Sequence, residues 1–223
     1  MSLRAHVQNI KQQDPAMKSV AEIVLYPSFW AVGFHRVAHW LFNRKLRWLA
    51  RFISQLSRWY TGIEIHPGAV IGSCLFIDHG MGVVIGETCI IGDYVTIFQG
   101  VTLGGTGKQT GKRHPTIGNH VIIGSGAKVL GPFTVGDNSR VGAGSVVLQE
   151  VPPDSTVVGI PGRVVIHGGH KTTENTDKND KLDKLDQSRM PDPVSKELCR
   201  LRNRVDKLEE KLAALTAAII EEE

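Results

Sequence analysis

The stretch that decides the fold runs from residue 117 to residue 148 and reads IGNHVIIGSGAKVLGPFTVGDNSRVGAGSVVL. A branched aliphatic residue occupies every sixth position of this stretch: Ile117, Ile123, Val129, Val135, Val141 and Val147. A period of six fits neither the roughly 3.6-residue repeat of a helix nor the simple alternation of a strand. It is typical of a solenoid in which each hexapeptide forms one short strand and one turn.

The same period continues toward the N-terminus and carries a longer order. The earlier aliphatic positions are Ile65, Ile71, Ile77, Ile85, Ile91, Ile97 and Leu103. The residues that follow the aliphatics read Gly118, Gly124, Leu130, then Gly136, Gly142, Leu148, with the same order at Gly86, Gly92, Phe98. Two glycines and one bulky residue predict a three-sided coil of 18 residues, although the pattern does not carry its phase across residues 104–116. The alternative, a β-sandwich, would show alternation and turns every ~8–12 residues.

The segment before the solenoid has a helical pattern. Residues 1–62 are predicted to be α-helical, with Pro27 opening one helix and Gly62 ending a second. Each helix has one apolar stripe. The first helix has Phe29, Val32, Phe34, Val37, Trp40 and Leu41, and the second has Leu46, Leu49, Phe52, Ile53, Leu56 and Trp59. Each stripe has to be buried against another surface. Residues 63–166 then form the repeat domain.

The segment after the solenoid divides into a linker and a heptad repeat. Residues 167–193 are polar and charged and contain Gly and Pro, which is typical of a linker. In residues 194–223 the apolar positions are alternately four and three apart: Val194, Leu198, Leu201, Val205, Leu208, Leu212, Leu215 and Ile219. This spacing predicts a short coiled-coil helix, and a lone amphipathic helix that packs on the body is the alternative.

The composition of the 223 residues narrows the class of protein. A hydrophobic content of 41% supports a real core, and a net charge of +4 without a basic stripe gives little support to nucleic-acid binding. Cys74, Cys89 and Cys199 form no C-x-x-C, which argues against a disulfide framework and a structural zinc site. Charged residues interrupt the apolar stretches near the N-terminus, so neither a signal peptide nor a membrane span is expected. We therefore expect a cytoplasmic protein.

The hexapeptide repeat breaks twice, and each break contains a histidine. The interval 77–85 is eight residues long instead of six and contains His79. The interval 103–117 is fourteen residues long and contains His114. Chemistry usually lies on loops that a rigid scaffold holds, so both breaks are candidate functional segments.

His79 is a candidate general base, because an imidazole titrates near neutral pH and can take a proton from a hydroxyl. Such a base needs a carboxylate that orients its ring. Glu64 lies fifteen residues upstream, close to the length of one coil, so we expect it beside His79 from the neighbouring coil. The alternative is a surface histidine in a turn.

Arg113 and His114 are candidates for anion binding, because a guanidinium presents a planar fork to a carboxylate. A flexible, solvated loop is the alternative. His66 and His120 lie in turns of the repeat, where a histidine is more often structural or solvent-facing. Histidines scattered in this way do not require a metal, and we expect no metal site.

Taken together, the motifs resemble those of the bacterial serine acetyltransferases. They are Glu64-Ile65-His66-Pro67, Ile77-Asp78-His79-Gly80, Gly86-Glu87-Thr88, the run from Gly100 to Lys108, Arg113-His114-Pro115 and Gly142-Ala143-Gly144-Ser145-Val146-Val147. The resemblance extends over residues 12–166 and includes both breaks. It implies a left-handed parallel β-helix, an exception to the usual right-handed crossover. It also implies a homotrimer with active sites between neighbouring subunits.

The resemblance further implies roles for individual residues. His79 corresponds to the catalytic base of the family and Glu64 to its carboxylate partner, at a position where the family often has Asp. The residues that match the family's serine-binding positions are Asp14, Asp78, Arg113 and His114. The residues that fall where the family lines its coenzyme A channel are Gly105, Ser125, Arg140 and Ala143.

The implied activity is transfer of the acetyl group from acetyl-CoA to the hydroxyl of L-serine, which gives O-acetyl-L-serine and coenzyme A. This is the first step of cysteine biosynthesis from serine. Three alternatives stay open at this point. They are a hexapeptide acetyltransferase for a sugar or antibiotic hydroxyl, a metal-dependent hydratase, and a non-catalytic assembly protein.

The resemblance bears on partners as well. The N-terminal helical region is shorter than in the enterobacterial type, which favours a trimer over a hexamer. Members of the family often form a complex with O-acetylserine sulfhydrylase through a C-terminal Ile. Here the sequence ends Ile219-Ile220-Glu221-Glu222-Glu223, which argues against that complex.

Overall fold

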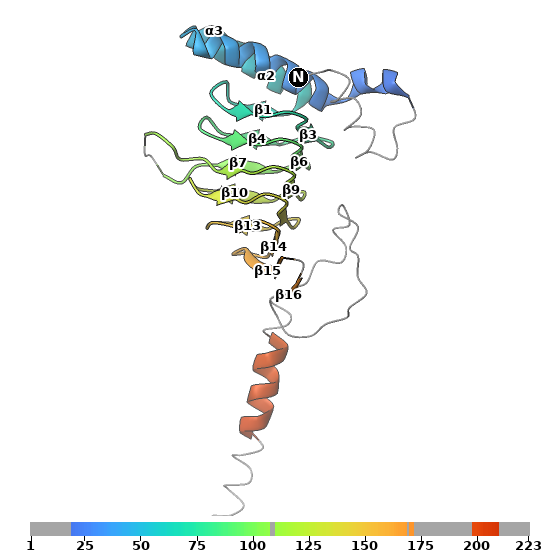
Figure 1. The fold of residues 1–223 in the computed structure, drawn as a ribbon, viewed down its shortest axis with the longest axis vertical. Coiled ribbons are helices and arrows are strands. Elements are labelled where there is room, and N and C mark those ends of the chain that lie inside the picture. The colour runs from blue at the N-terminus through green and yellow to red at the C-terminus, as the bar shows by residue number, and fades with distance from the viewer. Residues whose placement is uncertain (1–18, 108–109, 169, 172–197, 210–223) are drawn as a thin grey trace, which may run out of the picture. The chain divides into compact units, whose positions relative to one another are not determined.

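The computed structural model describes residues 19–107, 110–168, 170–171 and 198–209. The chain forms two compact units, Met1–Met190 and Pro191–Glu223, and each is described by itself. In the first unit, helices come first and a stack of short strands follows them (Figure 1).

The helices that precede the strands are η1 (Val20–Leu25), α2 (Pro27–Asn43) and α3 (Arg47–Thr61). Pro27 is the first residue of α2, where its missing N–H costs no hydrogen bond and its fixed φ suits a helix. Gly62 follows α3 with a φ of 72°, a left-handed conformation that glycine adopts without strain. The predicted start at Pro27 and the predicted end at Gly62 are therefore confirmed.

The strands of the repeat form three sheets. Sheet A contains β1 (Glu64–Ile65), β4 (Val84–Ile85), β7 (Thr102–Gly104), β10 (Lys128–Leu130) and β13 (Val146–Val147). Sheet B contains β2 (Val70–Ile71), β5 (Ile90–Ile91), β8 (Thr116–Ile117) and β11 (Thr134–Val135). Sheet C contains β3 (Phe76–Ile77), β6 (Thr96–Ile97), β9 (Ile122–Ile123), β12 (Arg140–Val141), β14 (Ser155–Val158), β15 (Arg163–His167) and β16 (His170–Lys171). Strand β15 pairs antiparallel with both β14 and β16, so strand pairing continues to Lys171.

Each coil passes through sheets A, B and C in turn, and successive coils pair in parallel register. In sheet A, Ile65 pairs with Ile85, Ile85 with Leu103, Leu103 with Val129 and Val129 with Val147. These steps span 20, 18, 26 and 18 residues of the sequence. The coil of 18 residues is confirmed, and the two longer steps contain the two breaks. The chain folds as a left-handed parallel β-helix, as the resemblance implies.

The long loop connects sheet A to sheet B. This determines to which sheet each hexapeptide after the loop belongs, which the sequence leaves open. Leu103 belongs to sheet A, and the next aliphatic, Ile117, belongs to sheet B. After the loop the bulky Leu130 follows a sheet A position, whereas before it Phe98 follows Ile97 in sheet C. The order of two glycines and a bulky residue therefore holds on both sides of the loop, but it begins on different sheets.

Inward-facing aliphatic side chains from all three sheets fill the coil. Buried members are Ile65, Ile85, Leu103, Val129 and Val147 from sheet A, Ile91, Ile117 and Val135 from sheet B, and Ile77, Ile97, Ile123, Val141 and Val157 from sheet C. Helix α2 adds Ala31 and Val32 to this core, so the helices close the first coil (Figure 1). Burial of one such side chain contributes about 1.5–3 kcal/mol.

The expectation that both apolar stripes are buried is wrong for α3 within one chain, and it holds only in part for α2, where Val37 and Trp40 are 52% and 54% exposed. Leu46, Leu49, Phe52, Leu56 and Trp59 are 40–82% exposed. The helix instead buries its small side chains: Ala50, Ser54, Ser57 and Thr61. Small residues let the α3 backbone approach the first coil, and the Ser54 hydroxyl donates to the Ile65 carbonyl at 2.7 Å. The large apolar side chains of α3 are therefore available to pack against another surface.

In the second unit, residues 198–209 are helical. The heptad positions of this helix, Leu198, Leu201, Val205 and Leu208, are 51–62% exposed. The other heptad positions and residues 172–197 lie outside the described residues, so the coiled coil and the linker stay predictions. No helix in the described part of the chain is both long and apolar enough to cross a bilayer.

Candidate functional site

Two edges of the triangular coil carry the candidate residues. We call the turns from sheet C to sheet A, which are residues 78–83, 98–101, 124–127 and 142–145, the C–A corner. The turns from sheet A to sheet B, which are residues 66–69, 86–89, 105–115 and 131–133, are the A–B corner.

A column of backbone hydrogen bonds holds the C–A corner. Its bonds are Gly82 N to Gly62 O, Gly100 N to Met81 O, Gly126 N to Gln99 O and Gly144 N to Ser125 O, at 2.8–3.0 Å. The donor glycines have φ angles of 66–74°, which glycine adopts freely. Ser125 and Ala143, two of the predicted coenzyme A residues, therefore lie on the same corner as His79.

His79 and Gly80 are the two surplus residues at this corner. Both adopt left-handed backbone conformations, with φ angles of 57° and 76°. Such a conformation costs energy for a residue with a side chain. The His79 side chain is 74% exposed, and its Nε2 lies 3.8 Å from Oδ2 of Asp78. The imidazole thus projects from the corner with a carboxylate beside it.

Within one chain, the Glu64 carboxylate pairs with arginines of α3, whereas its position in the sequence suggests His79 as the partner. Its Oε2 lies 3.0 Å from Nη1 of Arg58, and its Oε1 lies 3.5 Å from Nη2 of Arg51. Both arginines belong to α3, so the carboxylate ties α3 to β1. The pairing of Glu64 with His79 stays a prediction. The glutamate side chain is long enough to turn toward the helix instead.

At the A–B corner, the end of the long loop is fastened to Thr88. The Thr88 hydroxyl oxygen accepts from the backbone N–H groups of Arg113 at 3.0 Å and His114 at 3.1 Å. It also lies 2.9 Å from Nδ1 of His114, and the Thr88 N–H donates to the same Nδ1 at 3.2 Å. The Lys112 ammonium donates to the Thr88 carbonyl at 2.8 Å. Three successive loop residues are therefore held by one threonine.

The environment of His114 keeps its ring neutral. The residue is only 8% exposed, and burial together with the neighbouring Arg113 guanidinium lowers the pKa of His114. Gly86 lies directly against the ring, because a Cβ at this position would overlap the imidazole. A neutral imidazole that accepts at Nδ1 carries its proton on Nε2 and can donate it to an anion.

Arg113 reaches the same corner through an ion pair. Its Nη2 donates to Oε2 of Glu87 at 2.6 Å, and both side chains are about one-third exposed. A bond to a carboxylate fixes one edge of the guanidinium and leaves further N–H groups for a second anion. Arg113 and His114 thus both lie at this corner, and their binding of one anion stays a prediction.

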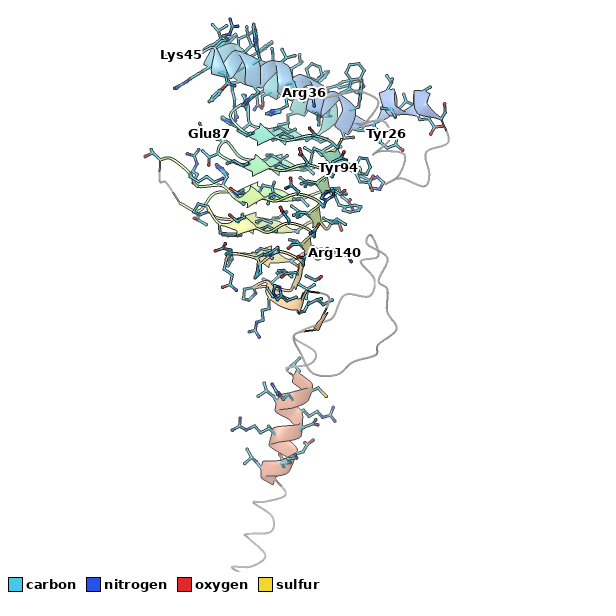
Figure 2. All side chains as sticks on the ribbon, viewed as in Figure 1. Tyr26, Arg36, Lys45, Glu87, Tyr94 and Arg140 are labelled. Atoms are coloured by element: carbon cyan, nitrogen blue, oxygen red, sulfur yellow. The ribbon has the colours of Figure 1, made fainter. Side chains whose placement is uncertain are left out.

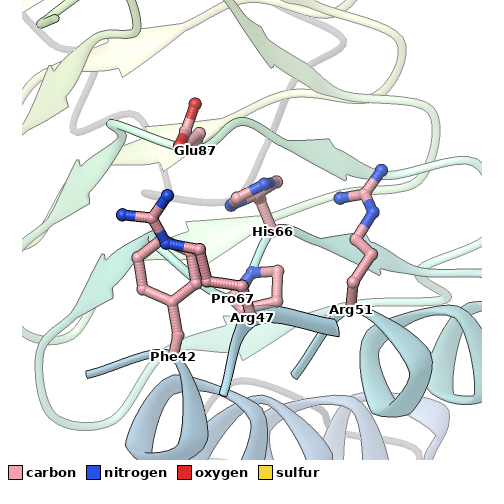
Figure 3. A pocket seen from close by; sticks show the side chains of 6 residues that line it. All are labelled: Phe42, Arg47, Arg51, His66, Pro67 and Glu87. Carbon is pink, nitrogen blue, oxygen red and sulfur yellow. The ribbon is translucent and has the colours of Figure 1, made fainter. Parts of the chain in front are cut away.

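A pocket of about 300 Å³ lies beside this pair and is lined by Phe42, Arg47, Arg51, His66, Pro67 and Glu87 (Figure 3). His66 accepts from the Gly68 N–H through Nδ1 at 3.0 Å, and burial lowers the pKa of His66. His120 stacks on Tyr94 with ring centroids 5.1 Å apart, on the third corner of the coil. These contacts agree with structural roles for both histidines.

The remaining predicted residues are divided between the corners. Arg140 is the first residue of β12, and Val141 separates it from the C–A corner, whereas Gly105 lies at the A–B corner against Arg113. Figure 2 shows Glu87 and Arg140 on opposite sides of the coil. Asp14 lies outside the described residues. In the described part of the chain, no group of three or more His, Cys, Asp or Glu side chains could hold a metal ion.

The two histidine-bearing corners do not meet within one chain. Sheet A separates them, because His79 lies on the turn that leads into β4 and Arg113 and His114 lie at the end of the loop that leaves β7. His79 and Asp78 therefore form one half of a candidate site, and Arg113 with His114 forms the other. Their chemical roles are complementary, because one half can accept a proton and the other can bind an anion.

Comparison with known proteins shows the family of this chain. Residues 114–149 match the family model described as bacterial transferase hexapeptide (six repeats). The chain is 54% identical to a serine acetyltransferase of Bacillus pumilus, over 96% of this chain and 95% of the relative. It is also 54% identical to that of Bacillus subtilis, over 94% and 93% of the two chains. The chain belongs to the serine acetyltransferase family.

Solved structures of serine acetyltransferases share the fold. The Neisseria gonorrhoeae structure has a TM-score of 0.72 at 42% identity, over 74% of this chain and 63% of that chain. The soybean apoenzyme has a TM-score of 0.69 at 46% identity, over 72% and 66%. A Brucella abortus serine acetyltransferase in complex with coenzyme A has a TM-score of 0.72 at 44% identity, over 76% and 68%. The chain thus spans about two thirds of the length of these solved serine acetyltransferases.

Glu87 and Thr88 are residues of the candidate site that sequence reasoning missed. Their motif is part of the resemblance to the family, but no role was assigned to it. The register of β4 with β7 and of β5 with β8 puts residues 87–88 beside residues 113–114. That register could not be predicted, because the six-residue repeat is interrupted in the loop that connects β7 to β8.

Proposed function

We propose that this chain acetylates the hydroxyl of L-serine with acetyl-CoA and releases O-acetyl-L-serine and coenzyme A. The observation that carries this proposal is 52–54% identity to bacterial serine acetyltransferases over at least 92% of the chain. Solved relatives are described in complex with serine and with coenzyme A, which supports the same substrates here. We further propose that the enzyme acts in the cytosol, which is supported by its free cysteines Cys74, Cys89 and Cys199.

In the proposed mechanism, Arg113 and His114 of one subunit bind the serine carboxylate. Asp78 and Asp14 bind its ammonium and hydroxyl region. His79 of the neighbouring subunit, oriented by Glu64, removes the hydroxyl proton while the oxygen attacks the thioester carbonyl. His79 then protonates the sulfur of coenzyme A as it leaves. A positioned base supplies about 10²–10⁴ in rate, and the alignment of two bound substrates supplies much of the rest.

Direct transfer, without an acyl-enzyme, is supported by the state of the buried thiols. Burial raises the pKa of the Cys89 thiol to about 12, so it stays protonated at neutral pH and is a poor nucleophile. Cys74 is buried as well. The coenzyme A channel is proposed to follow Ser125, Ala143 and Arg140 along the C–A corner, with Gly105 contributed from the A–B corner.

A homotrimer is part of the proposal, and two observations support it. Within one chain, sheet A separates the base from the anion-binding pair. Two large apolar side chains of α3, Phe52 and Trp59, are 53% and 82% exposed. A neighbouring subunit can cover them in the proposed trimer. Analytical ultracentrifugation is expected to give three times the mass of the chain. No sulfhydrylase complex is proposed.

Thiol release from acetyl-CoA tests the activity. With L-serine we expect saturable release of coenzyme A, and with galactosides or other neutral sugar alcohols we expect only the background rate. The reason is that Arg113 and His114 offer a clamp for a carboxylate, which a neutral sugar lacks. Turnover with sugars and none with serine would overturn the proposal.

A further inference from the structure

We propose that Thr88 is a positioning residue, which holds Arg113 and His114 as a carboxylate clamp and fixes the imidazole of His114 with its proton on Nε2. This inference rests on the proposed function, because it takes Arg113 and His114 as the groups that bind the serine carboxylate. Thr88 itself would not touch the substrate and would act through these two residues.

Every polar group of Thr88 is used by the loop. Its hydroxyl oxygen accepts from the N–H groups of Arg113 and His114, and its carbonyl accepts from Lys112. Its own N–H donates to Nδ1 of His114. The next residue back, Glu87, binds the Arg113 guanidinium. The backbone and both side chains of residues 113–114 are therefore oriented by two neighbouring residues of the coil above.

The proton positions follow from the capacity of each group. A hydroxyl has one proton and two lone pairs, and both lone pairs of Thr88 are taken by backbone N–H groups. The remaining hydroxyl proton then points to His114 Nδ1, which lies 2.9 Å away. A backbone N–H can only donate, so Thr88 N donates to Nδ1 as well and shares its single lone pair with the hydroxyl. Nδ1 therefore carries no proton, and the ring proton is on Nε2.

This arrangement prepares the clamp before substrate arrives. Ring flips and the other tautomer of His114 would each break two hydrogen bonds to Thr88. The Nε2–H of His114 and the remaining N–H groups of the Arg113 guanidinium are then both available as donors to a carboxylate. Loss of the Thr88 hydroxyl would leave the Arg113 and His114 N–H groups without that acceptor and loosen both donors together.

The test compares Thr88→Val, which keeps the shape of the side chain and removes the hydroxyl, with Thr88→Ser, which keeps the hydroxyl. Thr134→Val, at an exposed position of β11 on sheet B, is the matched control. Each variant is assayed with L-serine and with L-serinamide, which keeps the hydroxyl and ammonium but lacks the carboxylate. The KM for acetyl-CoA and the oligomeric state are measured in parallel.

We expect Thr88→Val to lower kcat/KM for L-serine about 10-fold or more, mainly through KM, because hydrogen bonds to a charged group are loosened. The kcat/KM for L-serinamide and the KM for acetyl-CoA should stay within about twofold of wild type. Thr88→Ser and Thr134→Val should resemble wild type with both substrates. Equal losses with serine and serinamide, or no loss with either, would overturn the inference.

A second measurement needs no variant of Thr88 and no turnover. Nitrogen-15 NMR of histidine-labelled wild-type protein, with the His114 signal assigned by its loss in His114→Gln, is expected to show a proton on Nε2. A proton on Nδ1 would overturn the inference even if Thr88→Val failed to fold. If the wild-type enzyme does not acetylate serine, the proposed function is refuted. If it does, but Thr88→Val lowers kcat/KM for serine no more than for serinamide, only this inference is refuted.

Discussion

His79 and Arg113 lie at opposite ends of sheet A in the same chain, His79 on the turn that leads into β4 and Arg113 on the loop that leaves β7. A base and a clamp that act on one serine molecule have to lie within a few ångströms of it. In a trimer with cyclic symmetry, the C–A corner of one subunit can face the A–B corner of the next. The proposed mechanism therefore requires assembly of the subunits.

Replacing the base tests the role of His79. His79→Asn keeps the left-handed backbone, which Asn tolerates, and removes the proton acceptor. We expect kcat to fall about 10²–10⁴-fold, and His79→Ala to lose nearly all turnover as well. Because the side chain is 74% exposed, the melting temperature and the oligomeric state should not change. Met81→Ala, a change at an exposed neighbour, is the control. Activity near that of wild type in His79→Asn would remove the assignment.

The pairing of Glu64 separates catalysis from stability. If Glu64 orients His79 in the assembled enzyme, Glu64→Gln lowers kcat by about 10²-fold or more. Arg58→Ala removes the arginine 3.0 Å from Glu64 and should leave kcat unchanged. Both changes should lower the free energy of unfolding by less than about 1 kcal/mol, because the Arg58 side chain is 56% exposed. Equal effects of the two changes on kcat would mean that Glu64 acts only through α3.

The close contact between Gly86 and the His114 ring predicts a specific defect. In Gly86→Ala the new Cβ would overlap the imidazole, so His114 has to move away from Thr88. We expect the KM for L-serine to rise about 10-fold while the KM for acetyl-CoA changes little. Gly33→Ala, where a Cβ meets no other atom within 4 Å, should behave like wild type. An unchanged KM for serine in Gly86→Ala would show that the His114 ring is not held there.

Acid should lower the free energy of unfolding through His35, a buried residue of α2. Burial, with smaller contributions from His39 and Arg36, lowers the pKa of His35 to about 4, whereas in the unfolded chain it is near the ordinary value of about 6.5. Between these values the unfolded chain binds more protons, so stability is full above about pH 6.5 and falls as the pH drops to about 4. The loss is about 3 kcal/mol per chain.

Melting temperatures at pH 7.5 and pH 5, measured at one protein concentration, check this expectation. His35→Leu should make the pH dependence shallower, because Leu does not titrate, while His66 and His114, whose pKa values are also lowered by burial, keep part of it. His120→Leu, at an exposed position on the third corner, serves as the matched control and should keep the full dependence. An equally steep pH dependence in His35→Leu would assign the acid sensitivity to other groups.

The solenoid could be predicted from the sequence because its period is written in residues that have to be buried. Ile117, Ile123 and Val129 recur at six residues since each coil places one side chain on each inner face. The helix ends could be predicted for a local reason as well, because Pro27 and Gly62 act through their own backbone angles. The exposure of Phe52 and Trp59 could not, because an amphipathic stripe indicates that a surface is covered but not by which chain.

The candidate site could be predicted only in part. Interruptions of a strict repeat identified His79 and Arg113, and the resemblance to a family supplied their roles. The contacts of Thr88 with Arg113 and His114 depend on the register between coils across a loop with no repeat, and no local pattern encodes that register. The turn of Glu64 toward Arg58 likewise depends on where α3 lies over the first coil.

Mixed trimers provide the most direct measurement of an active site shared between subunits. His79→Ala and Arg113→Ala chains, each inactive alone, are co-expressed with different tags in equal amounts. If each site takes His79 from one chain and Arg113 from the next, a trimer with both kinds of chain has one intact site of its three. Random mixing then restores about a quarter of wild-type activity. No recovery in purified mixed trimers would contradict the shared site, because it would mean that both residues must come from the same chain.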